Sequence, residues 1–96
     1  MVRVMALIDF DEIEGFLAGH PDWLFEDSAI QRTFEFDDFA GSLEFVNRVG
    51  EVAEAADHHP DIDIRWNKVT LRLSTHSEGG ITAKDTSLAA QIDALN

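Results

Sequence analysis

Residues 38 to 57 form the longest stretch of the chain with helical periodicity, and segments that alternate apolar and polar residues lie on both sides of it. Within 38 to 57 an apolar residue returns every three or four positions, which is typical of a helix that buries one broad face. One long helix between strand-like segments favours an α+β fold. The apolar face is predicted to contain Phe39, Leu43, Phe45, Val46, Val49, Val52, Ala53 and Ala56.

Two β-hairpins are predicted, one on each side of this helix. The stretches "IDIRW" and "VTLRLST" alternate around Asn67 and Lys68, a two-residue connection of hairpin length. Residues 23 to 36 contain the turn-like cluster "EDS" and then the alternating stretch "IQRTFEF". The residues expected on the apolar faces are Ile30, Phe34 and Phe36 in the first hairpin, and Ile62, Ile64, Trp66, Val69, Leu71 and Leu73 in the second.

Shorter helices are predicted near both ends of the chain. Residues 9 to 19 place Phe10, Ile13, Phe16 and Leu17 on one face, with Gly19 as the C-terminal stop. Towards the other end, Thr82 followed three residues later by Asp85 resembles a capping box. It would open a helix that directs Leu88, Ile92 and Leu95 inward.

The predicted order is therefore α-β-β-α-β-β-α, a four-stranded antiparallel sheet with three helices on one face. Residues 1–96 are expected to form a single domain, because a chain of 96 residues can bury one modest core. Residues 1–8 have no clear period and are expected to be a flexible or strand-like extension, with Met5 as an alternative start to Met1. The opposite sheet face would carry Thr70, Arg72 and Ser74, which suits water or a subunit contact.

The composition excludes several classes of function. The absence of cysteine excludes disulfides, thiolate metal sites and cysteine nucleophiles, and it favours a cytoplasmic location. A net charge of −12 would repel phosphate backbones and anionic lipid surfaces, so neither direct nucleic-acid binding nor membrane binding is expected. No nucleophile-elbow serine and no phosphate-binding glycine loop follows a predicted strand.

The histidines are the candidate reactive groups. His58 and His59 lie at the predicted end of the long helix, where one histidine would suit the helix dipole but a second is not explained in this way. His76 follows a predicted strand at the edge of a glycine-containing loop, a usual place for a functional site. His20 lies in the loop "GHPD" and is expected to be exposed to solvent.

Acid–base catalysis is the chemistry that these histidines favour. Imidazole takes and gives protons near neutral pH. Glu54 precedes His58 by four residues, so on one helical face it could orient that ring. A zinc site is the minority alternative, because the chain lacks the His-Glu-x-x-His pattern. We therefore expect no metal.

The candidate residues follow one another at a specific spacing: Glu54, then His58, His59 and Pro60, then the aromatic Trp66, His76 and Asp85. This spacing resembles the signature of the pterin-4a-carbinolamine dehydratase family. The similarity extends to Trp23, "RTFEFDDFAGSLEFV" and "STHSEGGITAKDTSLAAQID", and so covers about residues 10 to 95.

The resemblance implies a hydro-lyase that dehydrates a 4a-hydroxytetrahydropterin, such as 4a-hydroxytetrahydrobiopterin, to the quinonoid dihydropterin. This step recycles the cofactor of a pterin-dependent aromatic amino-acid hydroxylase, and it requires no metal or organic cofactor. The resemblance further implies a homodimer or homotetramer. The resemblance does not specify the side chain of the pterin, the hydroxylase that is served or the size of the oligomer.

Residue roles follow from the same resemblance. His58 and His76 would be the principal acid–base pair, and His59 would hold the 4a-hydroxyl or replace one partner for the other stereoisomer. Glu54 and Asp85 would orient and stabilise the imidazoles. Pro60 and the backbone of Thr75, His76, Ser77 and Glu78 would form the walls of the pterin site, and Trp23 would shape the pocket. The alternative function is a non-catalytic pterin-binding or protein-interaction module with the same fold.

Overall fold

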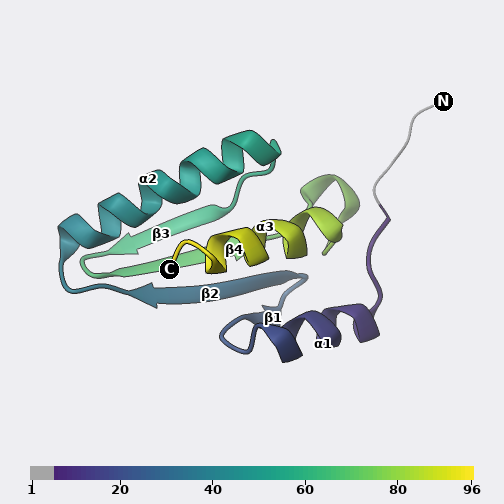
Figure 1. Ribbon diagram of the computed structural model, residues 1–96. Coiled ribbons are helices and arrows are strands. Elements are labelled where there is room, and N and C mark those ends of the chain that lie inside the picture. The colour runs from purple at the N-terminus through teal and green to yellow at the C-terminus, as the bar shows by residue number, and fades with distance from the viewer. Residues whose placement is uncertain (1–5) are drawn as a thin grey trace.

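The structure is a computed structural model that describes residues 6–96 (Figure 1). It confirms the predicted element order. The helices are α1 (Phe10–Gly19), α2 (Phe39–Ala56) and α3 (Ala83–Asp93), with a short 3-10 helix η1 (His76–Glu78) before α3. The strands are β1 (Leu24–Glu26), β2 (Ala29–Glu35), β3 (Asp61–Arg65) and β4 (Lys68–Leu73).

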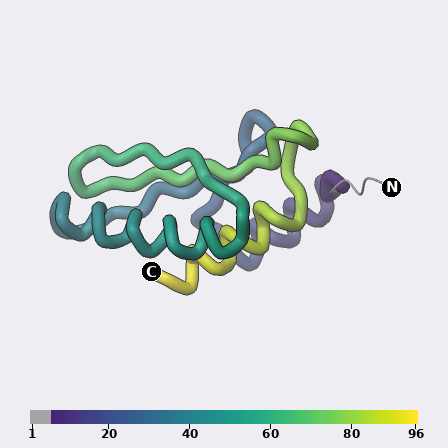
Figure 2. The backbone as a smooth tube through the Cα atoms, turned by 90° about the horizontal axis from the view of Figure 1, so that it is seen from above, coloured from purple at the N-terminus to yellow at the C-terminus, as the bar shows by residue number. Residues whose placement is uncertain are grey.

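The four strands form one antiparallel sheet in the order β1-β2-β4-β3. The three α-helices lie on one side of this sheet, as predicted (Figure 2). Residues just before α1 form a short strand-like contact outside the sheet: Leu7 makes an isolated antiparallel bridge with Thr82, and the amide of Ile8 donates to the Ile81 carbonyl at 2.9 Å. Residues 1–5, and with them the choice between Met1 and Met5, lie outside the described part of the chain.

The core lies between the sheet and the helices. In β2 and β4, strand alternation directs one set of side chains towards the helices, and these side chains are fully or almost fully buried. Ile62 and Ile64 of the edge strand β3 were expected on the same apolar face, but they are 40% and 37% exposed because no further strand among residues 6–96 covers this edge. Burial of this apolar surface is the main term that stabilises the fold. From the sheet the core contains Ile30, Phe34, Val69, Leu71 and Leu73, and from the helices Ile13, Phe45, Val49, Ala53, Leu88 and Ile92.

The long helix α2 has a narrower buried face than the pattern predicted. Its N-terminus is capped by Asp38, whose carboxylate accepts the Gly41 amide at 2.8 Å. The prediction that Phe39 and Leu43 face the core is wrong, since they are 47% and 41% exposed. The apolar face of α2 is wider than the surface that the sheet and α3 can cover, so its margin stays exposed. In the same way, Phe10 of α1 is exposed.

The two hairpin turns are both tight. Asp27 and Ser28 connect β1 to β2 with positive φ at both positions, which matches the twist of the strands. In the second hairpin the turn is Trp66-Asn67, one residue earlier than predicted, because Arg65 pairs with Lys68. Asn67 is held there by Phe36, which donates its amide at 2.8 Å and accepts the Asn67 side-chain amide at 3.0 Å. Trp66 is consequently exposed instead of facing the core.

The open face of the sheet is polar, as predicted. The hydroxyls of Thr33 and Thr70 lie 2.8 Å apart across β2 and β4. Arg72 donates to the Asp27 carbonyl and Ser74 to the Ser28 carbonyl, both at 3.0 Å. These bonds tie the end of β4 to the first hairpin turn.

Candidate active site

Sheet topology brings the sequence-distant histidines to the same end of the sheet. His58 and His59 precede β3, and His76 follows β4. The first residue of β3, Asp61, pairs with Arg72 near the end of the antiparallel strand β4. The chain segments that contain the three histidines therefore leave the sheet side by side.

The end of α2 determines where His58 and His59 lie. Asp57 adopts the left-handed conformation with φ 50°, which ends the helix. The amide of His58 then donates to the Ala53 carbonyl at 3.1 Å. Both histidines thus lie beyond the helix, and helical spacing does not describe their directions.

Asp85 is the centre of the polar network at this end of the sheet. It is 0% exposed, although it is a carboxylate. Its Oδ1 lies 2.5 Å from Nε2 of His58. Its Oδ2 accepts the Thr75 hydroxyl at 2.7 Å and the Thr82 amide at 2.9 Å. The hydrogen bond from the Thr82 amide belongs to the predicted capping box of α3, so Asp85 both caps the helix and contacts His58.

Glu54 contacts a different histidine from the one predicted. Its Oε1 lies 2.7 Å from Nε2 of His59, and both side chains are exposed. The prediction that Glu54 orients His58 is wrong, because the chain leaves the helix before His58. The exposed Glu54–His59 pair is screened by water and holds its geometry only weakly.

The other predicted site residues lie next to this network. Pro60 is half-buried between His59 and β3. His76 and Ser77 are exposed in η1, and Glu78 is half-buried. Thr75 immediately precedes them, is buried and contacts Asp85, so the start of η1 lies close to the Asp85–His58 pair.

Trp23 lies elsewhere. It is 1% exposed in the core, and its Nε1 donates to both carboxylate oxygens of Asp93, at 2.9 and 3.0 Å. Asp93 and Asp85 are eight residues apart on α3, about 12 Å along the helix axis. The structure therefore does not bring Trp23 into the Asp85–His58 network.

Asp93 lies at the centre of a second polar cluster, which the sequence pattern did not predict. Arg32 Nη1 donates to Asp93 Oδ1 at 2.7 Å, and Nδ1 of His20 lies 2.7 Å from Oδ2. The ring of His20 also stacks on Phe16. The prediction that His20 is an exposed loop residue is wrong, since the contact with Asp93 and the stacking on Phe16 hold it half-buried.

One sequence signal could have indicated this cluster. Ile30, Arg32 and Phe34 share strand parity, and Arg32 pairs with the buried Leu71. An arginine on the inward face of a strand must find a carboxylate, because an unpaired buried charge is costly. The pattern alone does not say which of many acidic residues supplies it.

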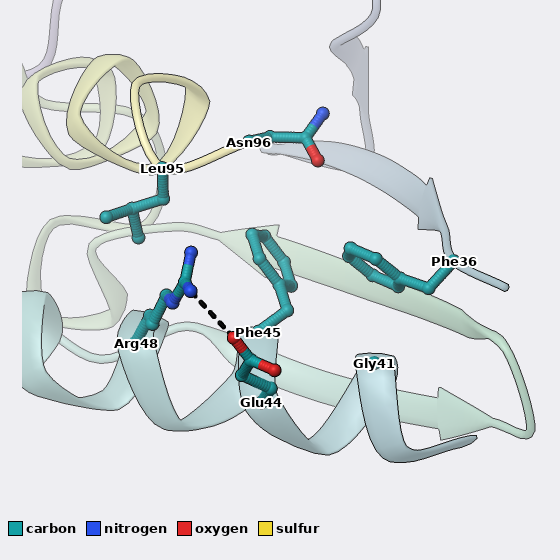
Figure 3. A pocket seen from close by; sticks show the side chains of 7 residues that line it. All are labelled: Phe36, Gly41, Glu44, Phe45, Arg48, Leu95 and Asn96. Atoms are coloured by element: carbon teal, nitrogen blue, oxygen red, sulfur yellow. Dashed lines mark hydrogen bonds and ion pairs between the residues drawn. The ribbon is translucent and has the colours of Figure 1, made fainter. Parts of the chain in front are cut away.

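Four surface hollows among residues 6–96 have no histidine in their lining. One hollow of about 220 Å³ is lined by Phe36, Gly41, Glu44, Phe45, Arg48, Leu95 and Asn96, where α2 meets the C-terminus (Figure 3). Three others lie along β1, β2 and the open face of the sheet. Within residues 6–96 no group of three histidine or acidic side chains is placed to hold a metal ion, and no helix is long and apolar enough to cross a membrane.

The arrangement offers proton-transfer groups of different character. His58 is mostly buried and bonded to a buried carboxylate, whereas His59 and His76 are exposed. A buried imidazole–carboxylate pair holds one ring nitrogen in place and leaves the other for reaction. Exposed imidazoles beside it could bind or exchange a proton with a ligand at this end of the sheet.

The fold and this site define a small α+β domain with a histidine cluster at the end of an antiparallel sheet. The family model described as "Pterin 4 alpha carbinolamine dehydratase" matches residues 6–95. The chain therefore belongs to the pterin-4-alpha-carbinolamine dehydratase family.

Relatives and solved structures agree with this membership. A protein of Mycobacteroides abscessus is 54% identical over 93% of this chain and 95% of its own length, and one of Picosynechococcus is 51% identical over 88% and 91%. Both carry pterin-4-alpha-carbinolamine dehydratase as a provisional name. The crystal structure of a "transcriptional coactivator/pterin dehydratase" from Brucella melitensis matches with a TM-score of 0.89 and 33% identity over 94% of this chain and 98% of that one.

A more distant structure shares the fold alone. It is described as a pterin dehydratase-like protein that is a RuBisCO assembly factor in the alpha-carboxysome. It matches with a TM-score of 0.62 and 22% identity over 76% of this chain and 84% of that chain.

Proposed function

We propose that the protein is a 4a-hydroxytetrahydropterin dehydratase that uses histidine acid–base catalysis. The observation that carries this proposal is the His58–Asp85 pair, at the same sheet end as His59 and His76, in a chain that belongs to the dehydratase family. A buried carboxylate that contacts an imidazole is a common way to prepare that ring for proton transfer.

The reaction removes one water molecule from the substrate. The bond between C4a and the hydroxyl oxygen breaks, the proton on N5 leaves, and a double bond forms between C4a and N5. An acid must protonate the departing hydroxyl and a base must take the N5 proton. Positioned acid–base groups typically contribute about 10²–10⁴-fold to such a step.

His58 and His76 are proposed as this acid–base pair, and His59 as the group that holds the 4a-hydroxyl or replaces one of them for the other stereoisomer. The different environments of the rings support this division, because His58 is held by Asp85 while His59 and His76 are exposed and accessible. Glu54 would hold His59, its partner at 2.7 Å. Pro60 and the backbone of Thr75, Ser77 and Glu78 would form the walls of the pterin site.

The wider setting is also a proposal. The pterin would be substrate and not cofactor, with no metal required, and its product would return to a pterin-dependent aromatic amino-acid hydroxylase in the cytoplasm. A homodimer or homotetramer is proposed as well. It would cover some of the exposed apolar side chains of α2, β3 and the following turn, which include Phe39, Leu43, Ile62, Ile64 and Trp66.

The test is the rate of carbinolamine dehydration, followed by ultraviolet absorbance with the 4a-hydroxy compound generated in situ by phenylalanine hydroxylase. The rate is measured in parallel with and without chelator. We expect the native protein to accelerate dehydration above the spontaneous rate, and His58→Ala and His76→Ala to reduce this acceleration at least about tenfold. His20→Ala is the matched control, because its ring lies in the Asp93 cluster.

Two results would contradict the proposal. A folded native protein that does not accelerate dehydration would favour a pterin-binding or protein-interaction role for the same fold. Acceleration that disappears with chelator would contradict metal-free catalysis.

A further inference from the structure

The buried hydroxyls behind Asp85 form a chain of hydrogen bonds with a defined direction. The Thr75 hydroxyl donates to Asp85 Oδ2 at 2.7 Å, which uses the single proton of that hydroxyl. The Thr82 hydroxyl lies 2.8 Å from the Thr75 oxygen and must therefore be the donor of that pair. Its own oxygen accepts the Lys84 amide at 3.2 Å. The donated protons thus run from Thr82 to Thr75 to Asp85.

Burial keeps the donors and acceptors of these hydrogen bonds from exchanging roles. Thr82 and Asp85 are 0% exposed and Thr75 is 7% exposed, so bulk water does not compete for their protons. Polar groups in such an environment hold one another in a single arrangement, because an unpaired buried donor or acceptor is costly. The Thr82 amide adds a further donor to Asp85 Oδ2 at 2.9 Å.

The direction of these hydrogen bonds determines which atom donates in the contact between Asp85 and His58. Two donors reach Oδ2, so that oxygen accepts and carries no proton. Oδ1 lies 2.5 Å from Nε2 of His58. When the carboxylate is ionised, Oδ1 can only accept, and Nε2 is then the donor of this hydrogen bond. Among residues 6–96 no hydrogen-bond partner is present at the other ring nitrogen, Nδ1.

We propose that Thr75 and Thr82 are positioning residues that act through Asp85: they fix His58 with its proton on Nε2 and leave Nδ1 as the nitrogen that exchanges a proton with the substrate. Neither hydroxyl needs to touch the substrate. This inference rests on the proposed dehydratase function for its catalytic consequence, but the protonation pattern of His58 is a property of the resting protein.

The central test uses paired substitutions at Thr75. Thr75→Val keeps the volume and removes the donor, whereas Thr75→Ser keeps the donor. We expect Thr75→Val to lower kcat about tenfold with KM within about twofold, because the change acts on proton transfer and not on binding. Thr75→Ser should remain within about twofold of native kcat. Thr82→Val and Thr82→Ser are the second pair, with helix content followed by circular dichroism because Thr82 also caps α3.

A spectroscopic readout separates positioning from packing. Histidine labelled with ¹⁵N reports by NMR which ring nitrogen carries the proton, and His58→Gln assigns the signal. At about pH 8, where an ordinary imidazole is neutral, we expect native His58 to be protonated on Nε2 only. Thr75→Val should give a mixture of both neutral forms, and Thr75→Ser should restore the native form.

The outcomes distinguish the two proposals. Protonated Nδ1 in the native protein, or an unchanged His58 signal with native kcat in Thr75→Val, would overturn the positioning role. If the native protein does not accelerate dehydration but its His58 signal is as expected and responds to Thr75→Val, the positioning role stands and the dehydratase function fails.

Discussion

The cluster around Asp93 makes a prediction about stability that is independent of the active site. Asp93 is the last residue of α3, and its carboxylate accepts bonds from Arg32 and Trp23 and contacts His20. Asp93→Asn removes the charge with almost no change in volume. The guanidinium of Arg32 would then remain over the ring of Phe34 at 4.2 Å. Within residues 6–96 its remaining anionic partner would be the exposed Asp22 at 3.4 Å.

The magnitude follows from burial. The side chains of Arg32 and Asp93 are 17% and 16% exposed, so water screens this pair far less than a surface pair. Removal of one partner from a buried pair costs about 3–5 kcal/mol. The lower end is expected here because Asn still accepts one bond and Arg32 keeps some contact with water. A loss of about 3 kcal/mol in a domain of this size lowers Tm by about 12–24 °C.

The assay is urea unfolding followed by tryptophan fluorescence and circular dichroism, at one protein concentration because an oligomer adds concentration-dependent stability. The matched control is Glu44→Gln, which breaks the exposed pair with Arg48 at 2.7 Å and should cost less than about 0.5 kcal/mol. Arg32→Met combined with Asp93→Asn should recover part of the loss, since no buried charge is left without its partner. A loss below about 1 kcal/mol in Asp93→Asn alone would refute the reasoning.

Three further outcomes are expected. Asp85→Asn should reduce dehydration by about 10²-fold or more, because an amide presents a donor as well as an acceptor to His58; native turnover in this variant would contradict the role of the carboxylate. Glu54→Gln should change kcat less than about threefold, since its bond to His59 is exposed, and steady-state kinetics at low salt will show whether the effect is larger. Leu71→Ala removes a fully buried side chain and should lower the free energy of unfolding in urea by about 3 kcal/mol. Ile64→Ala, at a 37% exposed position of the edge strand, should cost less than half as much, and equal losses would argue against the burial described.

Local patterns were sufficient for most of the fold. Alternation in "VTLRLST" and the helical period of 38 to 57 predict β4 and α2 closely, because each pattern reflects which side of an element meets the core. The capping box at Thr82 and Asp85 was also predictable, since both partners lie within one helical turn. The errors fall where coverage by another element decides, as at Phe39 and Leu43, or where a contact outside the hairpin selects the turn, as at Trp66.

The partners of the polar residues depend on distances in the folded chain that no local pattern records. The motif spacing selected His58, His59, His76 and Asp85 as candidates, whereas the four-residue helical spacing predicted Glu54 as the partner of His58. The left-handed residue Asp57 turns the chain out of α2, so His58 meets Asp85, 27 residues later, while Glu54 meets His59.

By itself, the sequence determined the order of the helices and strands, the family signature and the residue types available for proton transfer, because these depend on local periodicity and spacing. Only the tertiary structure decided that Asp85 is buried behind His58 and that Arg32, His20 and Trp23 meet at Asp93. Burial changes the strength of a charge interaction several-fold. It is a property of how the elements pack together, and so it belongs to the fold and not to any one segment.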